Sequence, residues 1–190
     1  MRVVQRADPR PGPGQVLVRN AAVGVNYIDL YHRSGFYPLD LPAVLGLEGA
    51  GTVVDCAPDV RDFAPGDRVA YTNVAGAYAD LHCIPADRLV PVPAEVPLES
   101  AAAAMLQGLT AHALSHSVYA IAPGDAVLIH AAAGGVGQLL VQFARARGAT
   151  VIATVSTEAK AALARAVGAQ HVIRYDQEDF SARAREITGG

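Results

Sequence analysis

The sequence predicts an α/β protein in which a β-rich first part precedes one half of a doubly wound parallel sheet. Short alternating or apolar runs, broken by glycine and proline, fill the first 97 residues. From about residue 98 the composition becomes alanine-rich, and strand and helix patterns then alternate to the end. Within that second part, residues 124–148 have the pattern of a strand, a small-residue turn and a helix. These observations together predict the fold class.

The bulk composition limits the classes of partner. Of 190 residues, 52% are hydrophobic and 17% charged, and the net charge is −3. This describes a soluble globular chain with an ample core, and its slightly acidic balance argues against a nucleic-acid partner. Neither a membrane span nor a signal peptide is evident, so we expect a cytoplasmic protein. Cys56 and Cys83 are expected to remain unpaired thiols.

The first part is expected to consist of short strands that follow turn-rich segments. We expect strands at 15–20, 44–46, 51–55, 68–71 and 77–84, and one short helix at 27–34 closed by Gly35. The glycines at 46, 49 and 51 are expected to mark bulges or close backbone approach.

The second part is expected to be a β-α-β-α-β-α unit. Two helices, at 99–106 and 111–119, are expected before this unit. Its own expected elements are strand 127–129, helix 136–147, strand 150–155, helix 157–166, strand 171–173 and helix 178–187. Right-handed connections wind these strands into a parallel sheet, which is one mononucleotide-binding half. The boundary between the two domains is expected near residues 98–110.

The turn between the first strand and helix of this unit has the chemistry of a pyrophosphate site. Gly134 and Gly135 would let the backbone approach phosphate oxygens at a helix N-terminus, and Gly137 would let the helix press on the strand. The strand 127–129 is expected to be buried on both faces, and Gly148 to end the helix. The usual fingerprint has glycine at the place of Ala132, so close packing alone is the alternative.

The spacing of a set of residues here resembles that of a known family. The set is Gly124, Asp125, Leu128, Ala132, Ala133, Gly134, Gly135, Gly137, Gln142 and Arg145. It is similar to the signature of the quinone oxidoreductase/ζ-crystallin family, the zinc-free branch of the medium-chain dehydrogenases/reductases. The resemblance implies a GroES-like catalytic domain at 1–100 and a Rossmann NADPH-binding domain at 101–190. Relative to that family we expect a chain truncated at both ends, with an N-terminal strand and the second Rossmann half missing.

The cofactor is expected to be NADPH. No carboxylate follows the strand 150–155 until Glu158, whereas hydroxyls and Lys160 suit a 2′-phosphate. The resemblance assigns Lys160 and Tyr175 to that phosphate; the alternative for Lys160 is a solvated helix lysine. The expected cofactor-binding residues are Thr110, Ala133, Gly134, Gly135, Val136, Gly137, Ser156, Lys160 and Tyr175.

No metal is expected on the substrate side. Asn26 and Leu47 stand where the zinc alcohol dehydrogenases carry cysteine and histidine ligands. By resemblance, the nicotinamide and substrate cleft is lined by Asn26, Asp29, Arg33 and Tyr37, and Thr110 approaches the nicotinamide. We expect Asn26 to position the reactants, and Tyr37 either to pack on the acceptor or to donate to its oxygen. For Asp29 and Arg33 the alternative is an i,i+4 ion pair.

The resemblance implies an NADPH-dependent reductase. Without a Lewis acid, the acceptor should already be electrophilic, which favours a quinone or a conjugated enone. The alternatives are an enoyl-thioester reductase of the same superfamily and a non-catalytic, crystallin-like NADPH-binding fragment. Full-length members are expected to be homodimers, and no membrane or nucleic-acid partner is expected.

Overall fold

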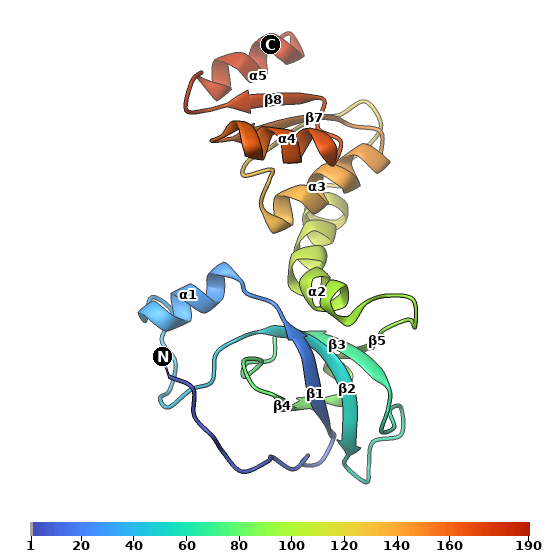
Figure 1. The fold of residues 1–190 in the computed structure, drawn as a ribbon. Coiled ribbons are helices and arrows are strands. Elements are labelled where there is room, and N and C mark those ends of the chain that lie inside the picture. The colour runs from blue at the N-terminus through green and yellow to red at the C-terminus, as the bar shows by residue number, and fades with distance from the viewer. Residues whose placement is uncertain (1) are drawn as a thin grey trace. The chain divides into compact units, whose positions relative to one another are not determined.

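The computed structural model describes residues 2–190, which divide into two compact units after Leu106. Unit 1 ends at Leu106 and unit 2 comprises Gln107–Gly190. In Figure 1, unit 1 runs from blue to green along the chain and unit 2 from yellow-green to red. The chain is therefore of the α/β class that the sequence predicts, with a β-rich part followed by a parallel one.

Unit 1 is built on a five-stranded antiparallel sheet with the strand order β4-β1-β2-β3-β5. The strands are β1 (Gln15–Val23), β2 (Glu48–Cys56), β3 (Arg68–Thr72), β4 (Leu81–Pro85) and β5 (Leu89–Pro91). The short helix α1 (Tyr27–Ser34) follows β1, and a 3-10 turn, η1 (Ala86–Arg88), joins β4 to β5. Alternate residues of the strands, such as Val16, Val18 and Val69, are buried in one apolar core.

The predicted strand at 44–46 is wrong. This segment is irregular, and Gly46 has a φ of +93° that a ladder residue with a side chain rarely adopts. Its carbonyls are used by another loop, because Leu45 O accepts from Tyr78 N and Gly46 O accepts from Ala77 N. The close approach expected at Gly51 is present, since a Cβ there would lie 2.0 Å from Arg19 O.

A long helix, α2 (Leu98–His112), continues into a π-helical segment, η2 (Ala113–Val118). The sequence had indicated two helices, at 99–106 and 111–119, and that prediction is wrong. Gly108 is the residue that could end a helix between them, and it lies inside α2. One glycine costs a helix only about 1 kcal/mol relative to alanine, so the helix continues through it.

The rest of unit 2 is the predicted β-α-β-α-β-α unit. Its elements are β6 (Ala126–Ile129), α3 (Gly135–Ala146), β7 (Thr150–Val155), α4 (Glu158–Ala166), β8 (His171–Arg174) and α5 (Phe180–Thr188). The three strands are parallel in the order β6-β7-β8. Val151, Ala153 and Val155 of β7 share a buried cluster with residues of α3 and α4. This packing sets the carboxyl ends of the strands along one edge of the sheet.

Burial of β6 on both faces was also expected, and this is wrong. Ile129 is buried, but Leu128, on the opposite face, is 37% exposed. In the part of the chain that the structure describes, β6 is an edge strand of the sheet. Leu128 therefore has a neighbouring strand on one side alone, whereas its partner Ile152 in the central strand is 2% exposed.

Candidate functional site

The turn between β6 and α3 is closely packed at Gly137. A Cβ at this position would lie 2.3 Å from Ala131 O and 2.7 Å from Ala132 Cα, so only glycine lets α3 approach the turn. Ala132 is fully buried, and its N–H donates to Thr154 O of β7 at 3.3 Å. Ala131 takes a left-handed φ of +49°. The turn is thus shaped by small residues on the strand side and by glycine on the helix side.

The other two glycines of the turn face outward. Gly134 and Gly135 are exposed, and Gly134 is the N-cap of α3. The first amides of a helix have no carbonyl partner within it and, with the helix dipole, favour an anion. A Cβ on Gly135 would meet the end of the Gln107 side chain, at 1.8 Å from Oε1. Gln107 therefore lies over the turn, and no pattern in the sequence predicts this contact.

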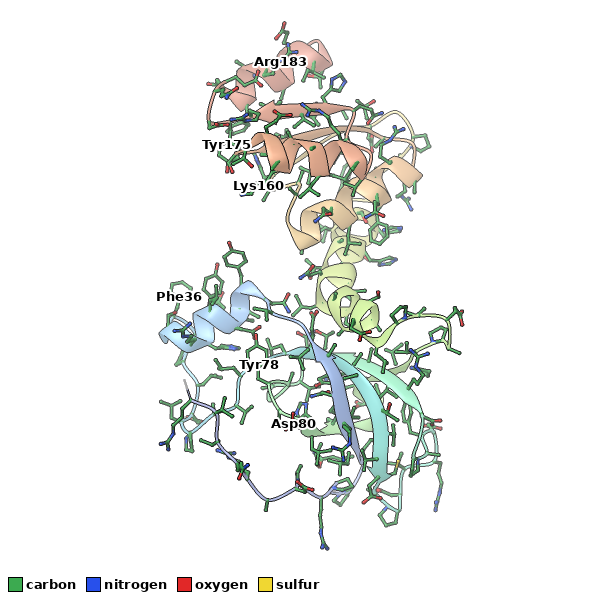
Figure 2. The ribbon with its side chains drawn as sticks, in the orientation of Figure 1. Phe36, Tyr78, Asp80, Lys160, Tyr175 and Arg183 are labelled. Carbon is green, nitrogen blue, oxygen red and sulfur yellow. The ribbon has the colours of Figure 1, made fainter. Side chains whose placement is uncertain are left out.

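At the carboxyl end of β7, Ser156 and Lys160 form a polar pair. Thr157 caps α4 by accepting from Lys160 N at 3.3 Å, and Lys160 Nζ donates to Ser156 Oγ at 3.2 Å. Tyr175 follows the adjacent β8, with its N–H bonded to Val155 O at 3.2 Å and its side chain 52% exposed. Because β7 and β8 are parallel, the two positions lie at the same edge of the sheet, as Figure 2 shows for Lys160 and Tyr175.

Two carboxylates at this edge are held by arginines. Glu158, in the first turn of α4, contacts Arg165 at 2.9 Å and Arg174 at 3.6 Å. Arg174 also forms a bidentate pair with Asp176. That pairing lowers the pKa of Asp176 and raises the pKa of Arg174. Arg174 was not among the predicted site residues; its place directly before Tyr175 was the available signal.

Unit 1 contains a buried polar cluster at the start of α1. Asn26 and Asp29 form a capping box, in which Asn26 N donates to Asp29 Oδ2 at 2.9 Å. Glu48, fully buried in β2, accepts from Asn26 Nδ2 at 3.0 Å and from Leu106 N at 3.1 Å. The Tyr78 hydroxyl donates to Asp29 Oδ2 at 2.8 Å. This cluster attaches α1 to the sheet.

Burial raises the pKa of two groups in this cluster, Glu48 and Tyr78. Burial raises the pKa of Glu48, and hydrogen bonds from Asn26 and Leu106 offset only part of that rise. Burial also raises the pKa of the Tyr78 hydroxyl, and its hydrogen bond to Asp29 raises it further. Glu48 Oε1 and Asp29 Oδ1 are buried without a hydrogen-bond partner among residues 2–190. Neither Glu48 nor Tyr78 is among the residues that the sequence predicts for the site.

An aromatic cluster lies on the outer side of α1. It contains Tyr27, Tyr31, Phe36 and Tyr37, whose neighbouring ring centroids lie 5.2–6.5 Å apart. Tyr37 is 45% exposed and Phe36, labelled in Figure 2, is 69% exposed. Such a surface suits a flat apolar ligand, because aromatic rings stack on one another.

Arg33 is exposed on α1, and among the described residues it forms no ion pair with Asp29. The i,i+4 alternative is therefore wrong, because Asp29 is buried and turned back to Asn26 and Tyr78. Thr110 lies in α2 and is half-buried.

The donor set in unit 1 does not resemble a cysteine and histidine metal site. Leu47 is apolar, Asn26 is engaged with Glu48, and Cys56 and Cys83 are free thiols. Over residues 2–190, the structure brings together no group of three or more histidine, cysteine or acidic residues that could hold a metal ion.

None of the described helices is long and apolar enough to cross a membrane.

Two family descriptions match successive parts of the chain. Residues 12–94 match the alcohol dehydrogenase GroES-like domain. Residues 135–190 match the domain described as zinc-binding dehydrogenase. The first match covers the five-stranded sheet and α1, and the second covers α3 to α5.

Known proteins resemble the chain over nearly its full length. A 2-haloacrylate reductase from Burkholderia sp. is 49% identical, over 95% of this chain and 56% of that protein. Quinone oxidoreductase 1 of Escherichia coli K12 is 44% identical, over 100% of this chain and 59% of that protein. The chain thus spans less than two thirds of the length of these relatives.

Solved structures are similar to the same extent. The crystal structure of Escherichia coli quinone oxidoreductase complexed with NADPH superposes with a TM-score of 0.96 at 44% identity, covering 98% of this chain and 58% of that one. The quinone oxidoreductase of Pseudomonas syringae pv. Tomato DC3000 gives 0.96 at 48% identity, with the same coverage.

Proposed function

We propose that this chain is a member of the quinone oxidoreductase family and takes part in the NADPH-dependent reduction of a quinone or a conjugated enone. Unit 2 would bind the nucleotide and unit 1 would supply the catalytic domain. In terms of function, we assign residues 1–100 to the catalytic domain and residues 101–190 to the nucleotide-binding domain. The proposal for the cofactor is supported by a relative whose structure contains NADPH.

The observation that carries the proposal is the environment of Lys160. It is the sole lysine of the sequence, and it stands at the carboxyl end of β7, bonded to Ser156. A cation and hydroxyl donors at this edge suit a dianionic 2′-phosphate. Tyr175, exposed at the same edge, would be a further contact for the phosphoadenosine.

The glycine turn fits the pyrophosphate of the same cofactor. Gly134 and Gly135 leave the N-terminus of α3 uncovered by Cβ atoms, and Gly137 lets the helix approach the turn. Ala133 and Val136 complete the segment. Its amides would bind the phosphate oxygens, except that of Gly134, which donates to Ala131 O at 2.8 Å. NADPH supplies a hydride when bound. Thr110 would lie beside its nicotinamide ring.

The acceptor would bind beside α1. Asn26, fixed by Glu48, would position the reactants, and Arg33, which has no ion pair among residues 2–190, would present a cation toward an acceptor oxygen. The aromatic cluster of Tyr27, Tyr31, Phe36 and Tyr37 would stack on a planar acceptor. Asp29 would hold α1 through Asn26 and Tyr78. We propose that this chemistry uses no zinc, because Asn26 and Leu47 offer no cysteine or histidine ligand.

The single lysine permits a direct test of the nucleotide site. An amine-reactive acetylating reagent can modify only Lys160 and the chain's amino terminus, which mass spectrometry distinguishes. We expect NADPH to slow acetylation of Lys160 about tenfold at concentrations where NADH has no effect. Equal protection by both nucleotides, or none, would contradict the proposed site. Acetylation of the amino terminus is the internal control.

One relative supports a second hypothesis for the substrate of this chain. A 2-haloacrylate reductase is among the similar proteins, and a haloacrylate is an alkene conjugated to a carboxylate. Arg33, without an acid partner among the described residues, would suit such an anionic acceptor. An enoyl thioester is the related neutral acceptor. Rates of NADPH oxidation with 1,2-naphthoquinone, 2-chloroacrylate and an enoyl thioester separate these substrates.

The alternative proposal is that the chain binds NADPH and catalyses no reaction, as a crystallin-like fragment would. It predicts that NADPH protects Lys160 while none of the three acceptors is reduced. Oxidation of NADPH by any acceptor in the presence of this chain, above the rate without protein, would rule it out. A cytoplasmic location and a homodimeric full-length form are further proposals of the same account.

A further inference from the structure

Glu158 lies in the first turn of α4, three residues after the end of β7, close to the strand end where nucleotide sites of this kind often carry an acid. It lies about 20 residues beyond Gly137, the distance at which an acidic side chain binds the ribose 2′-hydroxyl of an unphosphorylated nucleotide. It also lies two residues before Lys160. A free carboxylate here would therefore favour a ribose hydroxyl and repel a 2′-phosphate.

The carboxylate of Glu158 is not free. Its Oε1 contacts Arg165 at 2.9 Å and its Oε2 contacts Arg174 at 3.6 Å. The two arginines approach it from different elements, Arg165 from the last turn of α4 and Arg174 from the end of β8. Both oxygens of Glu158 are thus directed at guanidinium groups.

Arg174 holds a second carboxylate in the same way. Its Nε and one terminal nitrogen bond the two oxygens of Asp176, at 3.1 and 2.7 Å. The Arg174 side chain is 21% exposed, less than Glu158 at 68% or Asp176 at 37%. One guanidinium, set directly before Tyr175, therefore pairs with the acid two residues before Lys160 and with the acid directly after Tyr175. Lys160 carries no ion pair in the described part of the chain.

We propose that Arg174 is a specificity-determining residue that selects the 2′-phosphorylated nucleotide by holding Glu158 and Asp176 away from it. This inference rests on the proposed NADPH site and adds to it a residue that acts through its two acids. Removing Arg174 would release Asp176 and leave Glu158 with Arg165 as its one ion-pair partner among the described residues. The two carboxylates would then be freer to repel the phosphate, to pair with Lys160 or to accept from a ribose hydroxyl. Each effect lowers the preference for the phosphorylated form.

The effect should be modest and dependent on salt. A carboxylate several ångströms from a dianion, in a solvent-exposed setting, changes affinity by about three- to tenfold at low ionic strength. Exposed ion pairs alone contribute little to stability, so the folded structure should tolerate the substitution.

Adenosine 2′,5′-bisphosphate and adenosine 5′-monophosphate test the proposal, because they differ only in the 2′-phosphate and need only the nucleotide half that unit 2 contains. Isothermal titration of the 190-residue chain gives the ratio of their affinities. We expect Arg174→Ala to lower the ratio three- to tenfold. Adding both Glu158→Gln and Asp176→Asn to that variant should restore most of the loss.

The control is Arg185→Ala on α5, which removes the same charge from unit 2 at a residue without an ion pair among those described. It should leave the ratio within twofold of the wild type. An unchanged ratio in Arg174→Ala would overturn the inference while leaving the NADPH site intact. A wild-type chain with no preference between the two nucleotides would overturn the proposed site as well.

A second variant, which keeps Arg174, tests the proposal if Arg174→Ala does not fold. The variant Glu158→Gln/Asp176→Asn keeps Arg174 and removes its acids, which leaves an additional cation at the edge. We expect the ratio to rise three- to tenfold, and 0.5 M salt to diminish that rise. A ratio that falls or stays constant would contradict the proposal.

Discussion

Glu48 and Asn26 are joined by a buried hydrogen bond of 3.0 Å that ties the first residue of β2 to the N-cap of α1. The arrangement requires Gly24, where a Cβ would lie 2.1 Å from Glu48 Oε1. It accounts for the placement of Asn26, whose amide is held before any ligand binds. It also buries a carboxyl whose second oxygen has no hydrogen-bond partner among residues 2–190.

The buried carboxyl should make stability depend on pH. Because burial raises the folded pKa of Glu48 above its ordinary value of 4.5, the native state keeps a proton that the unfolded chain releases. The contribution of Glu48 to the free energy of unfolding should therefore fall as the pH rises from 4.5 to the raised pKa, and stay level beyond it. Urea denaturation followed by circular dichroism, at a series of pH values, measures this.

Glu48→Gln should remove that decline, because glutamine keeps the shape and does not titrate. Glu95→Gln, at an exposed residue, should leave the decline as in the wild type. A Glu48→Gln chain that loses stability over the same pH range as the wild type would show that another group is responsible.

Gly137 should be intolerant of a side chain. Gly137→Ala places a Cβ 2.3 Å from the backbone oxygen of Ala131, which cannot move without shifting β6 or α3. We expect a loss of about 1–3 kcal/mol of stability, together with weaker nucleotide binding. Gly108→Ala is the matched control, since nothing lies within 4 Å of its Cβ in α2. That change should stabilise the chain by about 0.5–1 kcal/mol, and a similar loss in both variants would contradict the account.

The ring of Tyr37, and not its hydroxyl, should matter for the acceptor. Its ring lies edge-on to Tyr31 at 5.5 Å and close to Phe36 at 5.2 Å. We expect Tyr37→Phe to keep kcat/KM for 1,2-naphthoquinone within about twofold, and Tyr37→Ala to lower it about tenfold. A loss of about a hundredfold in Tyr37→Phe would instead identify the hydroxyl as a proton donor.

Local sequence patterns predicted the strands and helices of unit 2 well. The Gly134 to Gly137 turn, the left-handed Gly148 just after α3 and the three parallel strands all follow from spacing along the chain. The strand predicted at 44–46 is wrong because the carbonyls of this segment bond the loop before β4. A run of apolar residues does not indicate such a contact with a distant part of the chain. The break predicted in α2 failed because a single glycine is too weak a signal.

At the site, the sequence could predict only contacts between residues that are close to each other in the chain. Lys160 and Ser156 lie one helical turn apart, so their pairing could be expected. The contact of Tyr78 with Asp29 and that of Arg174 with Glu158 connect residues from different elements. Such contacts depend on how the sheets are assembled, and no spacing in the sequence indicates them.

The central claim is that Lys160 selects the phosphorylated coenzyme, and the most direct test compares the dissociation constants of NADPH and NADH for the wild type and Lys160→Ala by fluorescence titration. The account predicts that the wild type prefers NADPH at least tenfold, and that Lys160→Ala reduces this preference by about tenfold, or about 1.4 kcal/mol. It predicts that NADH binding changes little. A Lys160→Ala chain that keeps the full preference for NADPH would contradict the account.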